Sequence, residues 1–258
     1  MPEHNVVSWT AMLAAYSEIG NLGEAIRIFN EIRQRDIDMP QTDLITWTAL
    51  LTAYSQDGNV EEAKLSKAVF GSMPRRTVAS WTVLSAAYSQ SGQVEMARKL
   101  FGCMPQRDTA AWGGILAAYA SNGLPGQALD LFFEMQLEEA PNAACFEAAL
   151  AACVHLGQMD AARSIFVSMR ESYGVHPSKR DHCCIADLLC RAGSLDDAMD
   201  LIAAMPFAPD DLEWSCVLRS CRNGADLAIA RAGAKYFDPR AASGYVLVAN
   251  AMAVEWKR

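Results

Sequence analysis

Residues 78–108 read VASWTVLSAAYSQSGQVEMARKLFGCMPQRD, and they contain two apolar stripes with the spacing of an α-helix. The first stripe joins Trp81, Leu84 and Tyr88. The second stripe comprises Ala97, Leu100, Phe101 and Met104. Gly92 lies between the two stripes, at a position where glycine commonly ends a helix. The stretch therefore predicts two helices joined by a tight turn.

The same pattern recurs along the chain at intervals of 31 to 38 residues, which defines a series of repeats. The first stripes begin at seven anchor residues: Trp9, Trp47, Trp81, Trp112, Phe146, His182 and Trp214. A glycine stands eleven residues after each of the first six anchors: Gly20, Gly58, Gly92, Gly123, Gly157 and Gly193. A two-helix repeat cannot bury both of its faces alone, so neighbouring repeats must stack. We therefore expect an all-α fold, an α-solenoid superhelix of stacked helix-turn-helix repeats.

The spacing also predicts where each repeat begins and ends. Repeats one to six are expected over residues 6–43, 44–77, 78–108, 109–142, 143–178 and 179–210. Residues 1–5 are interpreted as the tail of a truncated preceding repeat and residues 211–258 as degenerate, truncated repeats, so both ends are expected to belong to a longer array. Repeat two carries three extra residues between Ala63 and Met73, which predicts a second helix that is about one turn longer or kinked.

Composition excludes several classes of protein. The 258 residues are 52% hydrophobic, which is ample for a core and argues against disorder, and no apolar run approaches the ~18 residues of a membrane span. The formal net charge of −8 has the wrong sign for a protein that grips nucleic acid mainly through its phosphates. Eight cysteines without a CxxC pair predict neither a disulfide framework nor a zinc site, and favour a reducing compartment.

Several stretches resemble pentatricopeptide repeat proteins of the plant-type PLS class, whose repeats differ in length. The resemblance is carried by Val6-Val7-Ser8-Trp9-Thr10, Val78-Ala79-Ser80-Trp81-Thr82, Met104-Pro105-Gln106-Arg107-Asp108 and Leu188-Leu189-Cys190-Arg191-Ala192-Gly193. The degenerate E-type repeats that end such proteins are similar to Met205-Pro206-Phe207-Ala208-Pro209-Asp210, Trp214, Ser220-Cys221-Arg222-Asn223-Gly224 and Ser243-Gly244-Tyr245-Val246-Leu247-Val248-Ala249-Asn250. The resemblance spans nearly the whole chain.

What the resemblance implies is single-stranded RNA bound with one base per repeat, read by two side chains and held by a third. The implied reader pairs, in repeat order, are Thr10 with Asp43, Thr48 with Thr77, Thr82 with Asp108, Gly113 with Asn142, Glu147 with Ser178, and Cys183 with Asp210. The implied apolar clamps are Val7, Ile45 and Ala79. The equivalent positions of repeats four to six carry Ala110, Ala144 and the charged Arg180. Repeats four to six depart from the family pattern, so Glu147, Ser178, Cys183 and Asp210 are expected to contribute less.

The chemistry of the pairs can be reasoned independently of the family. A carboxylate accepts hydrogen bonds from the N1–H and N2–H₂ edge of guanine, and a threonine hydroxyl donates or accepts beside it. The Thr/Asp pairs of repeats one and three are therefore expected to favour G. Repeat two, with Thr48 and Thr77, lacks the carboxylate and is expected to discriminate poorly.

No catalytic constellation occurs in the sequence. The HxE and PCxxC motifs of zinc deaminases, a phosphate-binding glycine loop, a nucleophile elbow and HExxH are all missing. The adjacent residues His182, Cys183 and Cys184 lack the usual spacing of metal ligands. We expect no enzyme activity, no metal, no cofactor, no small-molecule substrate and no membrane contact for these residues.

Two functions remain open. The first is sequence-specific binding of single-stranded RNA, as the specificity portion of a C-to-U editing factor of the mitochondrion or chloroplast that recruits a deaminase or other editing protein through its E-type region. The alternative is a protein-binding α-solenoid scaffold like the tetratricopeptide repeats, which acidity and the poor readers of repeats four to six favour. The tryptophans and tyrosines are predicted to lie in the core in both cases, because they share a helical face with leucines. The recurring threonines have a second interpretation as residues that favour helix starts.

Overall fold

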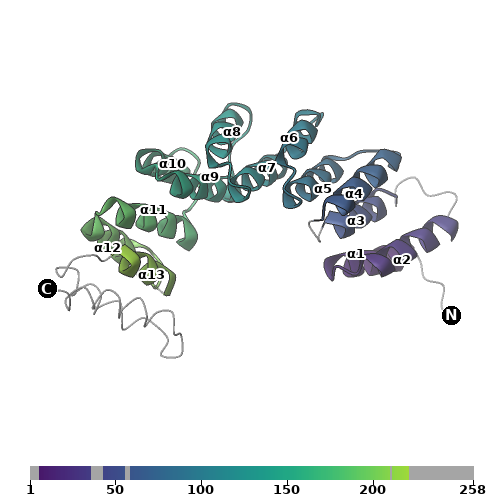
Figure 1. Ribbon diagram of the computed structural model, residues 1–258, viewed down its shortest axis with the longest axis horizontal. Helices are drawn as coiled ribbons and strands as arrows, with labels where there is room; N and C mark the ends of the chain where they lie inside the picture. Colours follow the sequence, from purple (N-terminus) through teal and green to yellow (C-terminus); the bar gives the residue numbers. More distant parts are fainter. Residues whose placement is uncertain (1–5, 36–42, 56–58, 210, 221–258) are drawn as a thin grey trace. The chain divides into compact units, whose positions relative to one another are not determined.

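The computed structural model describes residues 6–35, 43–55, 59–209 and 211–220, and within these ranges the chain is all-helical without strands (Figure 1). The helices are α1 (Val6–Glu18), α2 (Leu22–Arg35), α3 (Asp43–Ser55), α4 (Val60–Ser72), α5 (Val78–Gln90), α6 (Val94–Gly102), α7 (Thr109–Ser121), α8 (Pro125–Glu138), α9 (Ala143–Leu156), α10 (Met159–Glu171), α11 (Lys179–Ala192), α12 (Leu195–Ala204) and α13 (Asp211–Ser220). No helix in the described part is both long and apolar enough to cross a membrane.

Each of the six predicted repeats holds one first helix and one second helix, in the order that the two stripes require (Figure 1). α13 is the first helix of the seventh anchor, Trp214, and the degenerate repeats predicted after it lie outside the described residues. The chain divides into two compact regions, α1 to α7 and α9 to α13, with the boundary inside α8. The expected α-solenoid of stacked helical hairpins is thus observed within each region.

Two layers of helices build each region. The first helices pack against one another in a row, α1–α3–α5–α7 in one region and α9–α11–α13 in the other. Each second helix within a region packs on its own first helix and also on the first helix of the next repeat, as α4 does with α3 and α5. Within a region, a second helix therefore bridges two repeats, which is how a repeat with two apolar faces buries both.

An aromatic contact recurs at the second helices of the first five repeats, α2, α4, α6, α8 and α10, whereas α12 has no aromatic residue. A phenylalanine of the second helix meets the anchor ring of the next repeat edge to face. The pairs and their ring-centroid distances are Phe29–Trp47 (4.7 Å), Phe70–Trp81 (4.7 Å), Phe101–Trp112 (4.6 Å), Phe132–Phe146 (5.4 Å) and Phe166–His182 (5.1 Å). The prediction that the tryptophans and tyrosines lie in the core is confirmed for some of these rings and not for others. The buried rings are Trp47, Trp112, Trp214, Tyr88 and Tyr119, whereas Trp9, Trp81, Tyr16 and Tyr54 are half-buried.

The glycines end the first helices as predicted. Gly157 and Gly193 cap α9 and α11 with φ angles of 69° and 84°, in the left-handed region that other residues rarely adopt. Gly20, Gly92 and Gly123 have the same sign of φ. Gly58, the predicted end of the first helix of repeat two, lies outside the described residues.

The insertion in repeat two is absorbed by its second helix. α4 has 13 residues, four more than α6 in repeat three, a difference of about one turn. Ala63, Ser66 and Phe70 form its buried side, as the shifted stripe predicts. α2, α8 and α10 reach 13 or 14 residues without an insertion, so the length of α4 is ordinary for a second helix. The extra residues lengthen α4 relative to α6 and place the Met-Pro pair of this repeat farther along the chain.

Replacing one aromatic ring of the core tests whether the edge-to-face contacts hold the repeats together. Phe101→Ala removes a fully buried ring and its contact with Trp112, so we expect the free energy of unfolding to fall by about 3–5 kcal/mol. The control is Phe133→Ala, because Phe133 also lies on a second helix but is 49% exposed, and its loss should stay below about 1 kcal/mol. Urea unfolding followed by far-UV circular dichroism measures the stability of both variants. Equal losses of stability would contradict the conclusion that the edge-to-face contacts hold the repeats together.

Candidate nucleic-acid interface

The predicted threonine readers lie near the start of neighbouring first helices. Thr10, Thr48 and Thr82 are on α1, α3 and α5, and all three are half-buried. The Thr48 hydroxyl donates to the carbonyl oxygen of Leu44 at 2.6 Å, and the Thr82 hydroxyl donates to that of Val78 at 2.9 Å. Because each of these hydroxyl hydrogens is held by the residue's own helix, the oxygen offers its lone pairs as acceptors in this conformation.

The predicted second readers prove to be helix N-caps. Thr77, Asp108, Asn142 and Ser178 each precede a first helix, and each side chain accepts a hydrogen bond from a backbone N–H three residues later. The Asp108 Oδ1 bond to the Ala111 nitrogen is the shortest, at 2.8 Å. Asp43 is the first residue of α3, and its side chain lies outside the described part, as does Asp210. The second reader position thus has a structural role as the N-cap of a first helix, which the alignment of the repeats did not predict.

The clamp position presents apolar surface on the first helices. Ile45 is 63% exposed on the first turn of α3, and Ala79, Ala110 and Ala144 are exposed at the equivalent places. The Val7 side chain lies outside the described part. An isolated exposed isoleucine is ordinary on a protein surface, but Ile45 lies three residues before Thr48 and therefore on the same side of α3, so its apolar area is available to a ligand held by that threonine.

Repeat five brings its predicted pair into direct contact. The Ser178 hydroxyl lies 3.4 Å from Glu147 Oε1 and makes its shorter hydrogen bond, at 2.8 Å, to Asp181 Oδ2, so a reader on α9 touches the N-cap of α11. Arg180, at the clamp position of repeat six, places its Nη1 3.9 Å from Glu147 Oε2. Glu147 is therefore already partnered by a hydroxyl and a guanidinium, unlike the threonines that bond within their own helix.

Repeat six differs more strongly from the prediction. Cys183 is only 6% exposed, and its thiol donates to Glu213 Oε1 at 3.0 Å. Burial, followed by the hydrogen bond to the Glu213 carboxylate, raises the pKa of the Cys183 thiol far above its usual range. A buried neutral thiol fits the predicted reading role poorly, because a base would have to displace the carboxylate to reach it. The sequence analysis missed Glu213, although it stands where repeats one to five carry Ser8, Thr46, Ser80, Ala111 and Cys145.

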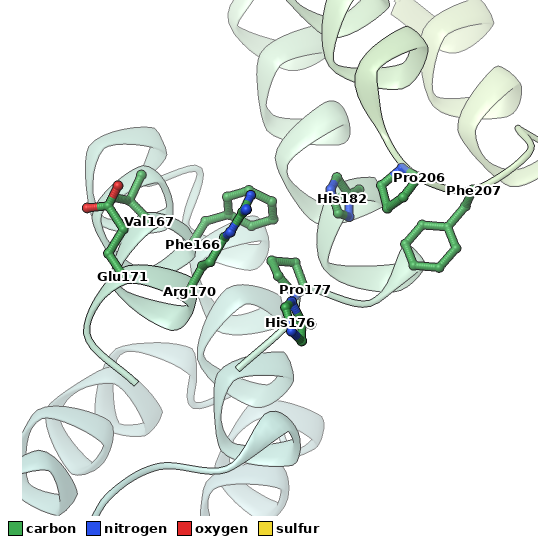
Figure 2. A pocket seen from close by; sticks show the side chains of 9 residues that line it. All are labelled: Phe166, Val167, Arg170, Glu171, His176, Pro177, His182, Pro206 and Phe207. Atoms are coloured by element: carbon green, nitrogen blue, oxygen red, sulfur yellow. The ribbon is translucent and has the colours of Figure 1, made fainter. Parts of the chain in front are cut away.

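A cavity of about 540 Å³ lies beside the anchor of repeat six (Figure 2). Its aromatic walls are Phe166, His182 and Phe207, and His182 meets the two phenylalanine rings edge to face at 5.1 and 5.9 Å. Arg170 and His176 supply polar groups at the cavity. An imidazole is smaller than the indole at this position in four of the first five repeats, which accounts for space next to it. The residues that the structure describes contain no cluster of three metal-ligating side chains.

The stacked hairpins, with capped first helices and aromatic bridges, define a helical-repeat protein of the α-solenoid class. A family model described as PPR repeat matches residues 7–37, 45–65, 79–108, 110–139 and 145–173, which together make up more than half of the chain. The chain therefore belongs to the pentatricopeptide repeat family.

Relatives in Arabidopsis thaliana support this assignment. One pentatricopeptide repeat-containing protein is 30% identical over 261 residues, which cover 100% of this chain and 35% of the relative. Another, described as mitochondrial, is 35% identical over 129 residues, covering 48% of this chain and 20% of the relative. The chain thus spans about a third or less of the length of these relatives.

Solved structures share the fold. The crystal structure of the pentatricopeptide repeat protein PPR10 from maize superposes with a TM-score of 0.64 at 16% identity, covering 99% of this chain and 42% of that protein. PPR10 in complex with an 18-nucleotide psaJ RNA element gives a TM-score of 0.52 at 14% identity, covering 99% of this chain and 41% of that protein. At these identities the likeness establishes the helical-repeat fold.

The cap at Asp108 gives a test that needs no ligand. Asp108→Ala removes the acceptor of the Ala111 N–H and should lower the free energy of unfolding by about 1 kcal/mol, whereas Asp108→Asn keeps an equivalent acceptor and should stay within about 0.5 kcal/mol of the parent protein. Chemical denaturation of both variants measures the difference. Equal stability of the alanine and asparagine variants would show that the hydrogen bond contributes nothing.

Proposed function

We propose that this chain binds single-stranded RNA along its rows of first helices, with one base facing each reading repeat. The single observation that carries the proposal is the placement of Thr10, Thr48 and Thr82 at equivalent points of three adjoining first helices. Family membership and the fold shared with PPR10, whose structure was determined with an RNA element, support it. In this mode Thr48 and Thr82 meet base edges while the exposed Ile45 lies against a base face.

The cap geometry is compatible with reading by the same side chain. The Asp108 carboxylate uses Oδ1 for the Ala111 N–H. A carboxylate has about four acceptor sites, so one cap bond leaves capacity for the two N–H groups of guanine. The cap also fixes the rotamer of the carboxylate before any base arrives, which reduces the entropy lost on binding.

The net charge of −8 restricts how such binding works. An acidic protein gains little from neutralising phosphates, so most of the affinity must come from base edges and stacked faces. We therefore expect a weaker dependence of affinity on salt than for basic nucleic-acid-binding proteins.

We further propose that the chain is the specificity portion of a C-to-U RNA-editing factor of the PLS class with E-type repeats, acting in the mitochondrion or chloroplast. The support is the sequence of the terminal stretch around Met205 and Trp214, and the mitochondrial description of some relatives. A deaminase or another editing protein would supply the chemistry, bound through the E-type region. Immunoprecipitation from organelles followed by sequencing of the bound transcripts tests this, and recovery of RNAs without edited cytidines would contradict it.

A protein-binding scaffold is the second candidate function. The cavity at His182 (Figure 2) favours it, and so do the exposed Phe133 and Leu137 on α8, because exposed apolar surfaces commonly contact other proteins. Pull-down of a partner that survives nuclease treatment and the Thr10→Ala and Thr82→Ala substitutions, with no measurable RNA affinity, would support the scaffold in place of RNA reading.

Binding assays with short RNAs test the main proposal. RNAs that carry G opposite repeats one and three should bind at least about tenfold more tightly than those with another base at either position, since a lost charge-assisted hydrogen bond costs about 1.5–3 kcal/mol. Substitution opposite repeat two should matter less. Equal affinity for all substitutions would contradict reading by these pairs.

Asp108→Asn should move the preference opposite repeat three from G toward A. The amide donates to adenine N1 and accepts from the adenine amino group, whereas it repels one guanine N–H. Because the asparagine preserves the cap, stability should not change, and any shift in base preference is then assignable to reading. Asp43→Asn should act in the same way opposite repeat one. Fluorescence anisotropy with the four single-base RNAs measures the shift, and an unchanged order of affinities would refute it.

Ile45→Ala should weaken RNA binding about fivefold, equivalent to ~1 kcal/mol of lost apolar contact, for all bases opposite repeat two. The matched control is Ile19→Ala, because Ile19 is also exposed, at 77%, and lies after the end of α1, away from the predicted readers. The control should bind RNA as the parent protein does. The clamp assignment is wrong if the two variants lose affinity equally.

A further inference from the structure

The reader position of repeat six is closed by the following repeat. The Cys183 thiol on α11 is bonded to the carboxylate of Glu213 on α13, and Glu213 has no exposed surface. By contrast, the Thr48 and Thr82 hydroxyls bond within their own helices, and both residues are half-buried. The two kinds of repeat thus differ in what a base would meet at the same position.

A charged partner keeps the Glu213 carboxylate in place. Lys179 Nζ lies 3.5 Å from Glu213 Oε1 and also donates to the Ala208 carbonyl oxygen at 3.0 Å. A buried carboxylate is stable only when it is paired and hydrogen-bonded. Lys179 and Cys183 together meet this condition, so leaving the site would cost Glu213 both partners.

The length of the Glu213 side chain explains how this position is closed. Equivalent positions in the other repeats carry shorter side chains, and those of Ser80 and Asp181 bond back to the backbone N–H of their own N-cap residue. Glu213 has one methylene more than Asp181, and it reaches across to the preceding first helix.

We propose that base reading along this chain ends before repeat six, because Glu213 occupies the place that the edge of a base would take at Cys183. The inference rests on the proposed RNA binding and defines its extent. The nucleotide opposite repeat five is then the last one that these repeats can read, and the nucleotide opposite repeat six contributes no sequence information.

The sharpest test is a variant that gains a base preference opposite repeat six. Cys183→Thr gives repeat six the same Thr/Asp pair as repeat three, with Asp210 as its second member. We expect the parent protein and Cys183→Thr to bind the four bases opposite repeat six within about twofold of one another. The double variant Cys183→Thr/Glu213→Ala, which has the alanine of repeat four at this place, should gain a preference for G of about tenfold. Discrimination by the parent protein, or a G preference in Cys183→Thr alone, would overturn the proposal.

Thiol reactivity tests the closed state without RNA. Alkylation by iodoacetamide at pH 8, followed by mass spectrometry of peptides, should modify exposed Cys103 rapidly and Cys183 slowly. Glu213→Ala should raise the rate at Cys183 about tenfold or more, because thiol reactivity follows access and thiolate fraction. Glu213→Gln, which keeps the volume of the side chain, should change it less. Equal rates at Cys103 and Cys183 in the parent protein would overturn the closed position.

The two outcomes separate the inference from the proposed function. Loss of base preference opposite repeats one and three would refute RNA reading altogether, and the inference with it. If the parent protein keeps its base preference opposite repeats one and three and also discriminates among bases opposite repeat six, only the inference that reading ends before repeat six is refuted.

Discussion

The edge-to-face contact between a phenylalanine of the second helix and the anchor of the next repeat, present in the first five repeats, is the constraint on which the other features depend. It is repeated five times with ring distances of 4.6 to 5.4 Å. Such pairs contribute about 0.5–1.5 kcal/mol beyond the area they bury. Because the anchor lies in the first turn of its helix, fixing its ring also fixes the N-cap before it and the reader after it. The positions of Asp108 and Thr82 therefore follow from the packing of Trp112 and Trp81.

The fold was predictable because it is encoded in local spacing. The stripes at Trp81 and Ala97 and the glycines that follow the first helices depend only on residues within one repeat, and both predictions are confirmed. The cap role of the second readers had a signal in the sequence, namely residues of the Ser, Thr, Asp and Asn type directly before each first helix. The contact of Cys183 with Glu213 had none, because it joins side chains 30 residues apart whose approach depends on how two helices stack.

Capping and the proposed reading require the same small set of side chains at one position. An N-cap must accept from the backbone, and a base-edge reader must donate or accept beside it, so both favour short polar residues. A substitution such as Asn for Asp changes the hydrogen-bonding pattern offered to a base while the helix start is kept. A hydrophobic residue would lose both roles at once. Base specificity can therefore vary at this position among a few short polar residues without loss of the fold.

The imidazole of His182 has a mechanical consequence for the second region. Its contacts with Phe166 and Phe207 join ring edges at 5.1 and 5.9 Å beside a cavity, whereas the junctions of the first region hold the larger indole of Trp47, Trp81 or Trp112 (Figure 2). Stretching a chain of stacked hairpins loads each junction in series, and the one with the fewest packed atoms yields first. Under tension, this hairpin would detach from its predecessor while the tryptophan-filled junctions of the first region still resist the pull.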